Sequence, residues 1–149
     1  MRIYLDDYQR SRGDIVKEFV RVKSEDYVGV LPYDPTTGEL VLIAEYHRGV
    51  DEVLVQLPSG KIKKGQTPLQ AAKSELREET GLSGRISPLS RLWEMGMFFD
   101  AKAHFFFAEV DVSTMAKQTL DANEEIAIIV TTVKEIYELI FSKNRKPID

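Results

Sequence analysis

The amino-acid sequence predicts an α+β fold built on a mixed sheet, and three observations support this prediction. Runs rich in β-branched and aromatic residues stand before and after one strongly capped helical segment. Their order is strands, helix, strands, helix, which differs from the regular alternation that builds a purely parallel sheet. The length of 149 residues fits a single domain spanning 1–149, large enough to bury roughly 68–70% of its unfolded surface.

The strands are predicted from short runs of β-forming residues bounded by turn residues. Asp34–Gly38 is a turn, because its proline fixes φ and its glycine accepts positive φ. The runs on either side of it therefore form a hairpin, and residues 1–26 add strands that form an N-terminal β-hairpin. The predicted strands are Ile15–Lys23, Tyr27–Tyr33, Glu39–Tyr46, Ile86–Met95, Ala103–Val112 and Ile126–Val130, the last a short buried strand.

Two helices are predicted from their capping residues. Thr67 is placed to cap the first helix, Pro68 suits its first position, and Gln70 completes a capping box. Gly81 is placed to end this helix. Thr132 and Glu135 form a second capping box, which predicts a C-terminal helix over Val133–Phe141. Leu57–Gly60 and Lys63–Gly65 are predicted to form an irregular loop before the first helix.

Composition and charge exclude several classes of function. The chain has no cysteine, which excludes disulfides, thiol catalysis and cysteine-rich zinc sites. No apolar run approaches the roughly 20 residues of a membrane span, so no membrane partner is predicted. A net charge of −4 gives no general attraction for nucleic acid. The charged, alternating N-terminus is unlike a signal peptide, and a cytoplasmic protein is expected.

The stretch SELREETGL gathers three glutamates near the end of the first helix: Glu75, Glu78 and Glu79. At about 100° per residue, Leu69, Ala72 and Leu76 form the core face, and the three acids lie together beside it. Like charges at these spacings weaken a helix, and its dipole disfavours anions at this end. The cluster is either a solvated acidic surface or a site for a divalent cation such as Mg²⁺, which takes oxygen ligands.

The segment Gly60–Leu82 resembles the Nudix box, Gx5Ex7REUxEExGU, in which U is aliphatic. The matching residues are Gly60, Glu75, Leu76, Glu78, Glu79, Gly81 and Leu82. The resemblance extends along most of the chain from Val28 onward, to the ADP-ribose pyrophosphatase-like branch. The segments that carry it are Val28–Pro32, the hairpin to Glu45–Tyr46, Leu57–Gly60, Lys102–Ala108 and Asn123–Ile126.

This resemblance implies a Nudix-type α/β/α sandwich that hydrolyses nucleoside diphosphates linked to a group X, with Mg²⁺ or Mn²⁺ as cofactor. By position, Glu75 and Glu79 are the expected direct ligands, and Glu78 completes the set directly or through water. The carbonyl of Ser59 or Gly60 is a further candidate ligand. A carboxylate outside the box often serves as base or extra ligand in the family, and Glu124 is the first choice for it. Lys61, Lys63 and Lys64 of the box loop either attract phosphate or remain solvated.

Five positions depart from the pattern of the family. Gln66 and Ser74 replace a glutamate and an arginine of the box, and Gln56 replaces a glutamate before the Leu-Pro pair. In the loop after the box, Gly96 and Ala101 stand where the branch has a proline and an acid. Gln66 and Ser74 together remove two charges that interact in the family, so no unpaired ion is left.

Three functions stay open at this stage. The first is an active pyrophosphohydrolase for ADP-ribose, a nucleotide sugar or a related nucleotide. The second is a nucleotide-binding or regulatory protein with weakened catalysis, and the third is an RNA-end or nucleoside triphosphate hydrolase. A homodimer in which residues 1–26 contact the second subunit is a further expectation.

Overall fold

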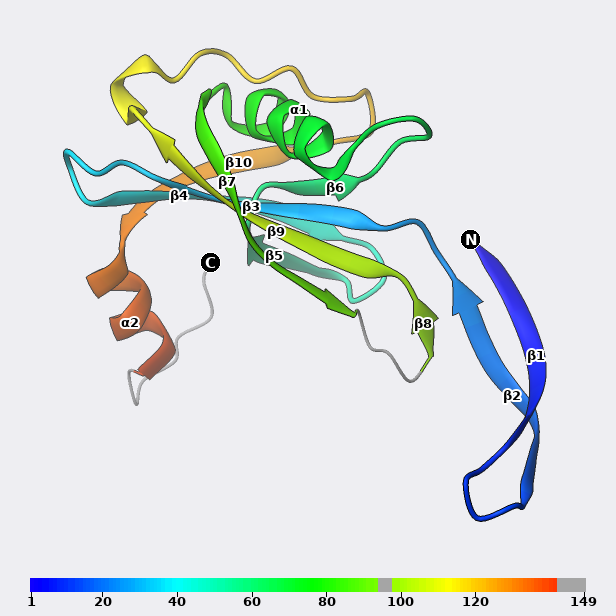
Figure 1. Cartoon of the computed structure of the whole chain (residues 1–149). Helices are drawn as coiled ribbons and strands as arrows, with labels where there is room; N and C mark the ends of the chain where they lie inside the picture. Colours follow the sequence, from blue (N-terminus) through cyan, green and yellow to red (C-terminus); the bar gives the residue numbers. More distant parts are fainter. Residues whose placement is uncertain (94–97, 142–149) are drawn as a thin grey trace.

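The computed structural model describes residues 1–93 and 98–141, which form two β-sheets and two α-helices (Figure 1). Among these residues, no helix is long and apolar enough to span a membrane. The strands are β1 (Arg2–Gln9), β2 (Ile15–Lys23), β3 (Tyr27–Tyr33), β4 (Glu39–His47), β5 (Glu52–Gln56), β6 (Ser59–Lys61), β7 (Gly84–Trp93), β8 (Phe99–Asp100), β9 (Lys102–Val110) and β10 (Ile126–Thr132). The helices are α1 (Pro68–Thr80) and α2 (Val133–Phe141), with a short 3₁₀ turn over Val112–Thr114.

The large sheet is mixed, as predicted. Its strand order is β10-β4-β3-β9-β7, with β3 and β9 parallel and the other neighbours antiparallel. Helix α1 lies on one side of this sheet and α2 on the other (Figure 1), so the predicted α/β/α arrangement is confirmed. The core beneath α1 is formed by apolar side chains of α1, β3, β4 and β9, among them Val28, Val41, Leu76 and Phe106.

Strands β3 and β4 separate soon after their turn, and this opening positions the box. Tyr33 and Leu40 are the one residue pair in register between the two strands. The segment after β4 fills the opening, because β5 pairs with β4 and β6 pairs with β3. The prediction of an irregular loop over Leu57–Gly60 is therefore wrong for its last two residues, which begin β6. Strand β5 was not predicted.

Helix α1 begins and ends where the sequence predicts. The Thr67 hydroxyl accepts a hydrogen bond from the Gln70 N–H at 3.3 Å, and the Gln70 side chain accepts one from the Thr67 N–H at 2.8 Å. The predicted core face is wrong at Leu69, which is 40% exposed. The buried face is rotated toward Glu79 and Thr80, because this side of α1 rests on β6 as well as on β3.

The prediction of the C-terminal helix is confirmed, and the prediction of a buried last strand is corrected. The capping box of α2 forms, with Glu135 accepting from the Thr132 N–H at 2.8 Å. Strand β10 is an edge strand rather than a buried one, because β4 is the only strand that pairs with it among residues 1–93 and 98–141. Ile126 is buried, but Val130 is 43% exposed.

The boundaries of β7 and β9 also differ from the prediction. Strand β7 begins at Gly84 rather than at residue 86, and the predicted end at Met95 lies outside the described residues. Strand β9 ends at Val110 rather than at Val112, because the Asp111 side chain accepts a hydrogen bond from the Ser113 N–H at 3.0 Å and starts the 3₁₀ turn.

The predicted N-terminal hairpin is confirmed. Strands β1 and β2 pair antiparallel, and the end of β2 pairs in parallel with β8. Figure 1 shows the hairpin extending away from the large sheet. Its connection to the rest of the chain therefore runs through β8 and the short link before β3.

Candidate metal centre

Glu79 is the most deeply placed acid of the box. The residue is 4% exposed, and its Oε2 accepts a hydrogen bond from the Ser59 N–H at 2.7 Å. Burial raises the pKa of Glu79 to about 8, against the opposing effect of this hydrogen bond, and the negative charges of Glu75, Glu124 and Glu45 raise it further. The carboxyl is thus held at β6 in surroundings that disfavour its own charge.

Glu75 lies one helical turn earlier, with its carboxyl group directly against the backbone of Gly60. A Cβ at position 60 would lie 2.3 Å from the carboxyl carbon of Glu75. Burial raises the pKa of Glu75 to about 7, with Glu78 as the next largest cause, while Lys63 lowers it. Gly60 therefore leaves the space that the Glu75 carboxyl occupies, which is a physical reason for glycine at this position of the box.

Glu78 faces a different part of the surface from its two neighbours. It is half-buried and lines a hollow of about 480 Å³ at the C-terminal end of α1, together with Lys63, Arg77 and Lys117. The three glutamates are therefore not equivalent. Glu75 and Glu79 point toward β6, and Glu78 lies at the edge of the cluster, where it raises the pKa of Glu75.

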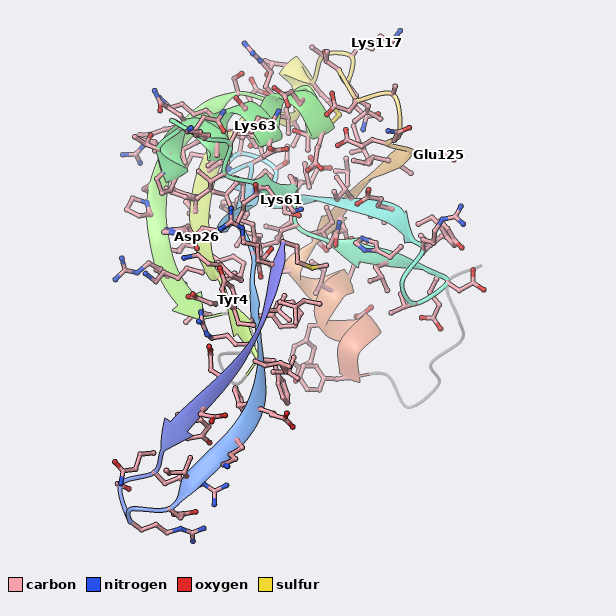
Figure 2. The ribbon with its side chains drawn as sticks, turned by 90° about the vertical axis from the view of Figure 1, so that its right-hand side faces the viewer. Tyr4, Asp26, Lys61, Lys63, Lys117 and Glu125 are labelled. Atoms are coloured by element: carbon pink, nitrogen blue, oxygen red, sulfur yellow. The ribbon has the colours of Figure 1, made fainter. Side chains whose placement is uncertain are left out.

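The segment 115–125 docks against the end of α1 and brings further acids to the cluster. The Ala116 N–H donates to the Gly81 carbonyl at 3.1 Å, and the Gln118 side chain donates to the Glu79 carbonyl at 2.6 Å. A Cβ on Gly81 would lie 1.9 Å from the Ala116 oxygen, and the residue has φ of +71°. Gly81 thus ends the helix and also permits this docking. Figure 2 marks the course of the segment with Lys117 and Glu125.

Glu124 lies on this segment, close enough for its charge to raise the pKa of both Glu75 and Glu79. Its own Oε2 accepts a hydrogen bond from the Asp121 N–H at 2.9 Å, and the residue is exposed. The structure therefore brings together Glu124 and the glutamates of the box. Sequence reasoning missed Asp121 and Glu45, which also act on the cluster, because no spacing in the chain connects them to the box.

The donor set of this cluster fits a divalent cation. As the side chains stand, no three acidic or histidine residues of the described chain converge closely enough to enclose an ion. The available groups are nevertheless hard carboxylate oxygens, the type that Mg²⁺ and similar ions prefer. A cation among Glu75 and Glu79 would turn their mutual repulsion into attraction, and Gly60 leaves room for the carboxylate beside it.

Gln66 and Ser74, the two residues that depart from the box pattern, make local contacts and form no charged pair. The side-chain oxygen of Gln66 accepts a hydrogen bond from the Lys63 N–H at 3.0 Å, which closes the turn before α1. Ser74 borders a cavity of about 360 Å³ between α1 and the start of β7, also lined by Lys73 and Arg77. No hydrogen bond joins Gln66 to Ser74 in the described part of the chain.

The mixed sheet, the capped box helix and the carboxylate cluster agree with a match to the model of the NUDIX domain family, which covers residues 23–148. The chain belongs to this family. It is a hydrolase, and the recognition made from the box is confirmed. Nudix hydrolases generally use divalent metal ions.

The chain is similar to proteins named as an ADP-ribose pyrophosphatase, a methanol dehydrogenase activator and an ADP-sugar pyrophosphatase. The ADP-ribose pyrophosphatase of Bacillus subtilis is 26% identical over 142 residues, which is 95% of this chain and 76% of that protein. The methanol dehydrogenase activator of Bacillus methanolicus is 25% identical over 144 residues, 96% of this chain and 77% of that protein. The ADP-sugar pyrophosphatase of Mus musculus is 32% identical over 92 residues, 58% of this chain and 42% of that protein.

Proposed function

We propose that this protein is a pyrophosphohydrolase that cleaves the diphosphate of a nucleoside diphosphate linked to X, with ADP-ribose or a nucleotide sugar as substrate and Mg²⁺ or Mn²⁺ as cofactor. The observation that carries this proposal is the pair of Glu79, which is buried, and Glu75, which is partly buried, beside β6, with pKa values raised to about 8 and about 7. The names of the similar pyrophosphatases support the substrate class.

Each acid has a proposed role in this reaction. Glu75 and Glu79 would hold the cation, with Glu78 contributing directly or through water and the carbonyl of Ser59 or Gly60 as a further ligand. When bound, such an ion supplies positive charge to the diphosphate and makes a bound water more acidic. Because phosphate is a good leaving group, positioning and charge account for most of the rate.

Glu124 is proposed as the general base that accepts a proton from the attacking water. Its segment is held against α1 by the hydrogen bonds of Ala116 and Gln118, and its charge raises the pKa of both Glu75 and Glu79. The Asp121 N–H orients one of its carboxylate oxygens.

A substrate screen tests the proposal. The purified protein is incubated with ADP-ribose, ADP-glucose, nucleoside triphosphates and 5′-triphosphorylated RNA, with Mg²⁺, Mn²⁺ or EDTA, and the products are separated by anion-exchange chromatography. We expect AMP and a sugar phosphate from the first two substrates, with metal only. Cleavage of triphosphates or RNA ends instead would favour the third function named above. Tight binding of ADP-ribose without cleavage would favour the binding or regulatory protein, which the neutral Gln66 and Ser74 also favour.

We also propose a homodimer formed through the N-terminal hairpin. Ile3 pairs with Val22 and Leu5 with Val20, so these side chains share one face of the hairpin. Ile3 is 67% exposed, Leu5 65% and Val20 45%. A second copy of the chain is the proposed cover for this apolar face, because contiguous exposed apolar surface on a soluble protein marks a contact site.

A further inference from the structure

The segment 115–125 provides partners for the last carbonyl groups of α1, which have no partner inside the helix. Figure 1 shows the segment running past α1 before it reaches β10. The Thr119 N–H donates to the Glu78 carbonyl at 2.8 Å. The side-chain amide of Gln118 donates to the Glu79 carbonyl at 2.6 Å. Among the side chains of this segment, all of which the structure describes, only Gln118 hydrogen-bonds to α1.

Gln118 also reaches the strand that follows the segment. Its Nε2 donates a second hydrogen bond, to the carbonyl oxygen of Ile126 at 3.3 Å. Ile126 is the buried first residue of β10. A carboxamide nitrogen carries two N–H groups, so one side chain can serve both carbonyls. Gln118 therefore joins the end of the box helix to the start of β10, and the chain between Gln118 and Ile126 is closed into a loop.

Glu124 lies within this closed loop. Residues 121–125 are exposed, so packing against the core does not hold them in place. The Asp121 N–H donates to the Glu124 carboxylate at 2.9 Å, and the Glu124 N–H donates to the Asp121 carbonyl at 3.0 Å, which defines a local turn. A local turn fixes the shape of the loop but not its distance from α1. The contacts of Gln118 at the two ends of the loop supply this second constraint.

Charge alone would push the loop away from the box. The negative charge of Glu124 raises the pKa of both Glu75 and Glu79, because like charges oppose one another. Gln118 resists this repulsion without adding charge, since its neutral amide donates to a carbonyl at the negative end of the helix dipole. Hydrogen bonds also have a defined length and direction, which suits them to fixing the place of a loop.

We propose that Gln118 is a positioning residue, which holds Glu124 at the box by bridging the end of α1 and the start of β10. The inference rests on the proposed function, because Glu124 is assigned there as the general base. Gln118 acts on the reaction only through the place of that base. A general base must lie within hydrogen-bond reach of the proton that it accepts. A loop released from this bridge would therefore lower the rate while the carboxylates of the box keep their places.

Two substitutions separate the hydrogen bonds of Gln118 from the shape of its side chain. Methionine has nearly the same length without an N–H group, and arginine keeps N–H donors on a longer chain. We expect Gln118→Met to lower kcat for ADP-ribose roughly ten- to hundredfold, with KM within about twofold, because the base is displaced. Gln118→Arg should recover most of this loss, and an equal loss in Gln118→Arg would overturn the inference.

Thr119→Ala is the matched control. Thr119 is the exposed neighbour of Gln118, and its backbone N–H keeps its hydrogen bond to Glu78 when the side chain is shortened. We expect kcat of this variant within about twofold of the wild type, because surface substitutions away from special contacts have small effects. A loss in Thr119→Ala equal to that in Gln118→Met would overturn the inference, since any change in the segment would then have the same effect.

The loss in Gln118→Met must also depend on Glu124. In a Glu124→Gln background, Gln118→Met should lower kcat no further than about twofold, because the base is already absent. A full further loss of kcat in this background would show that Gln118 acts through Glu79 or on the fold, and it would overturn the inference. Wild-type kcat in Gln118→Met alone would also overturn it.

Hydrogen exchange without substrate, measured by NMR, separates this inference from the proposed function. The N–H groups of Thr119 and Asp121 form hydrogen bonds that report the docking of the segment and the place of Glu124. We expect Gln118→Met to speed their exchange roughly three- to tenfold, the effect of one lost hydrogen bond, and to leave that of Leu76 in α1 unchanged. If the wild type cleaves no substrate, the proposed function fails, and this exchange then decides the role of Gln118 separately. Unchanged exchange at Thr119 and Asp121 would overturn the inference.

Discussion

The carboxylate cluster and the N-terminal hairpin are two regions with unsatisfied surfaces of opposite kinds. At the cluster, burial and neighbouring negative charges raise the pKa values of Glu75 and Glu79, and the charge of Lys63 only partly opposes this at Glu75. On the hairpin, the polar face is satisfied internally, because Arg21 pairs with Asp6 at 2.6 Å, whereas Leu5 on the other face is 65% exposed. The first region suits a cation and the second suits apolar surface, which are the partners proposed for them above.

The largest effect is expected from removing one charge of the cluster. Glu79→Gln should lower kcat for the cleavage of ADP-ribose on the order of 10²–10³-fold, because a ligand of the cation stabilises charge that develops in the transition state. Steady-state kinetics at saturating Mn²⁺ measures this. Glu138→Gln is the control, an exposed acid of α2 that carries the same chemical change. A kcat for Glu79→Gln equal to that of this control would show that Glu79 holds no essential ion.

The second prediction concerns pH and metal. The pKa values of Glu75 and Glu79 are raised in the folded chain from 4.5 to about 7 and about 8. The folded state therefore binds more protons than the unfolded state between about pH 4.5 and 8, and the free energy of unfolding falls as pH rises through that window. We expect urea unfolding in EDTA to show this decline, and Glu75→Gln/Glu79→Gln to flatten it.

Divalent metal should act against this decline. An ion that binds only the folded state adds about 2.7 kcal/mol at a concentration one hundred times its Kd. Saturating Mn²⁺ at pH 8 should therefore raise the urea midpoint of the wild type and leave that of Glu75→Gln/Glu79→Gln in place. A wild-type urea midpoint that rises with pH in EDTA would contradict this account of the cluster. A midpoint that millimolar Mn²⁺ does not change would also contradict it.

The sequence predicted the cluster better than it predicted the surroundings of the cluster. Capping residues, the position of Gly81 and the spacing of the glutamates are local patterns, and α1 forms as they indicate. Strand β6 was missed because its three residues pair only after β3 and β4 separate, which depends on contacts distant in the chain. Leu69 was assigned to the core for a similar reason: periodicity finds one apolar stripe, but the face that α1 buries is decided by β6.

The same limit applies to the acids outside the box. Glu45 on β4 and Asp121 before β10 act on the cluster only in the folded chain, where segment 115–125 docks on Gly81. Glu124 was predicted because the family resemblance extends to its segment, not because of its spacing from the box.

The third prediction tests the other side of the comparison. If the exposed face of the hairpin contacts a second copy, Leu5→Asp/Val20→Asp should convert a dimer to a monomer, because two charges would be buried without partners. Size-exclusion chromatography with light scattering measures the mass directly. Val53→Asp is the matched control, since Val53 is 63% exposed on β5, away from the hairpin. A wild type that stays monomeric at high concentration would remove the proposed dimer.

The smallest effect is expected within the box, at the two positions that lack their charges. Gln66 keeps the turn closed through Lys63, and Ser74 borders a cavity of about 360 Å³ that has room for a longer side chain. Ser74→Arg alone would place a third base beside Lys73 and Arg77 and should lower stability, and Gln66→Glu alone would add an acid near an acidic cluster. Gln66→Glu/Ser74→Arg should instead preserve or raise kcat by a few-fold, because each new charge has the other as its partner.

A double-mutant cycle on kcat and on the urea midpoint measures the coupling, which is expected to be roughly 0.5–3 kcal/mol for residues in contact. Strictly additive effects would show that the two positions do not interact, and the neutral box would then need an explanation other than the joint loss of a charged pair.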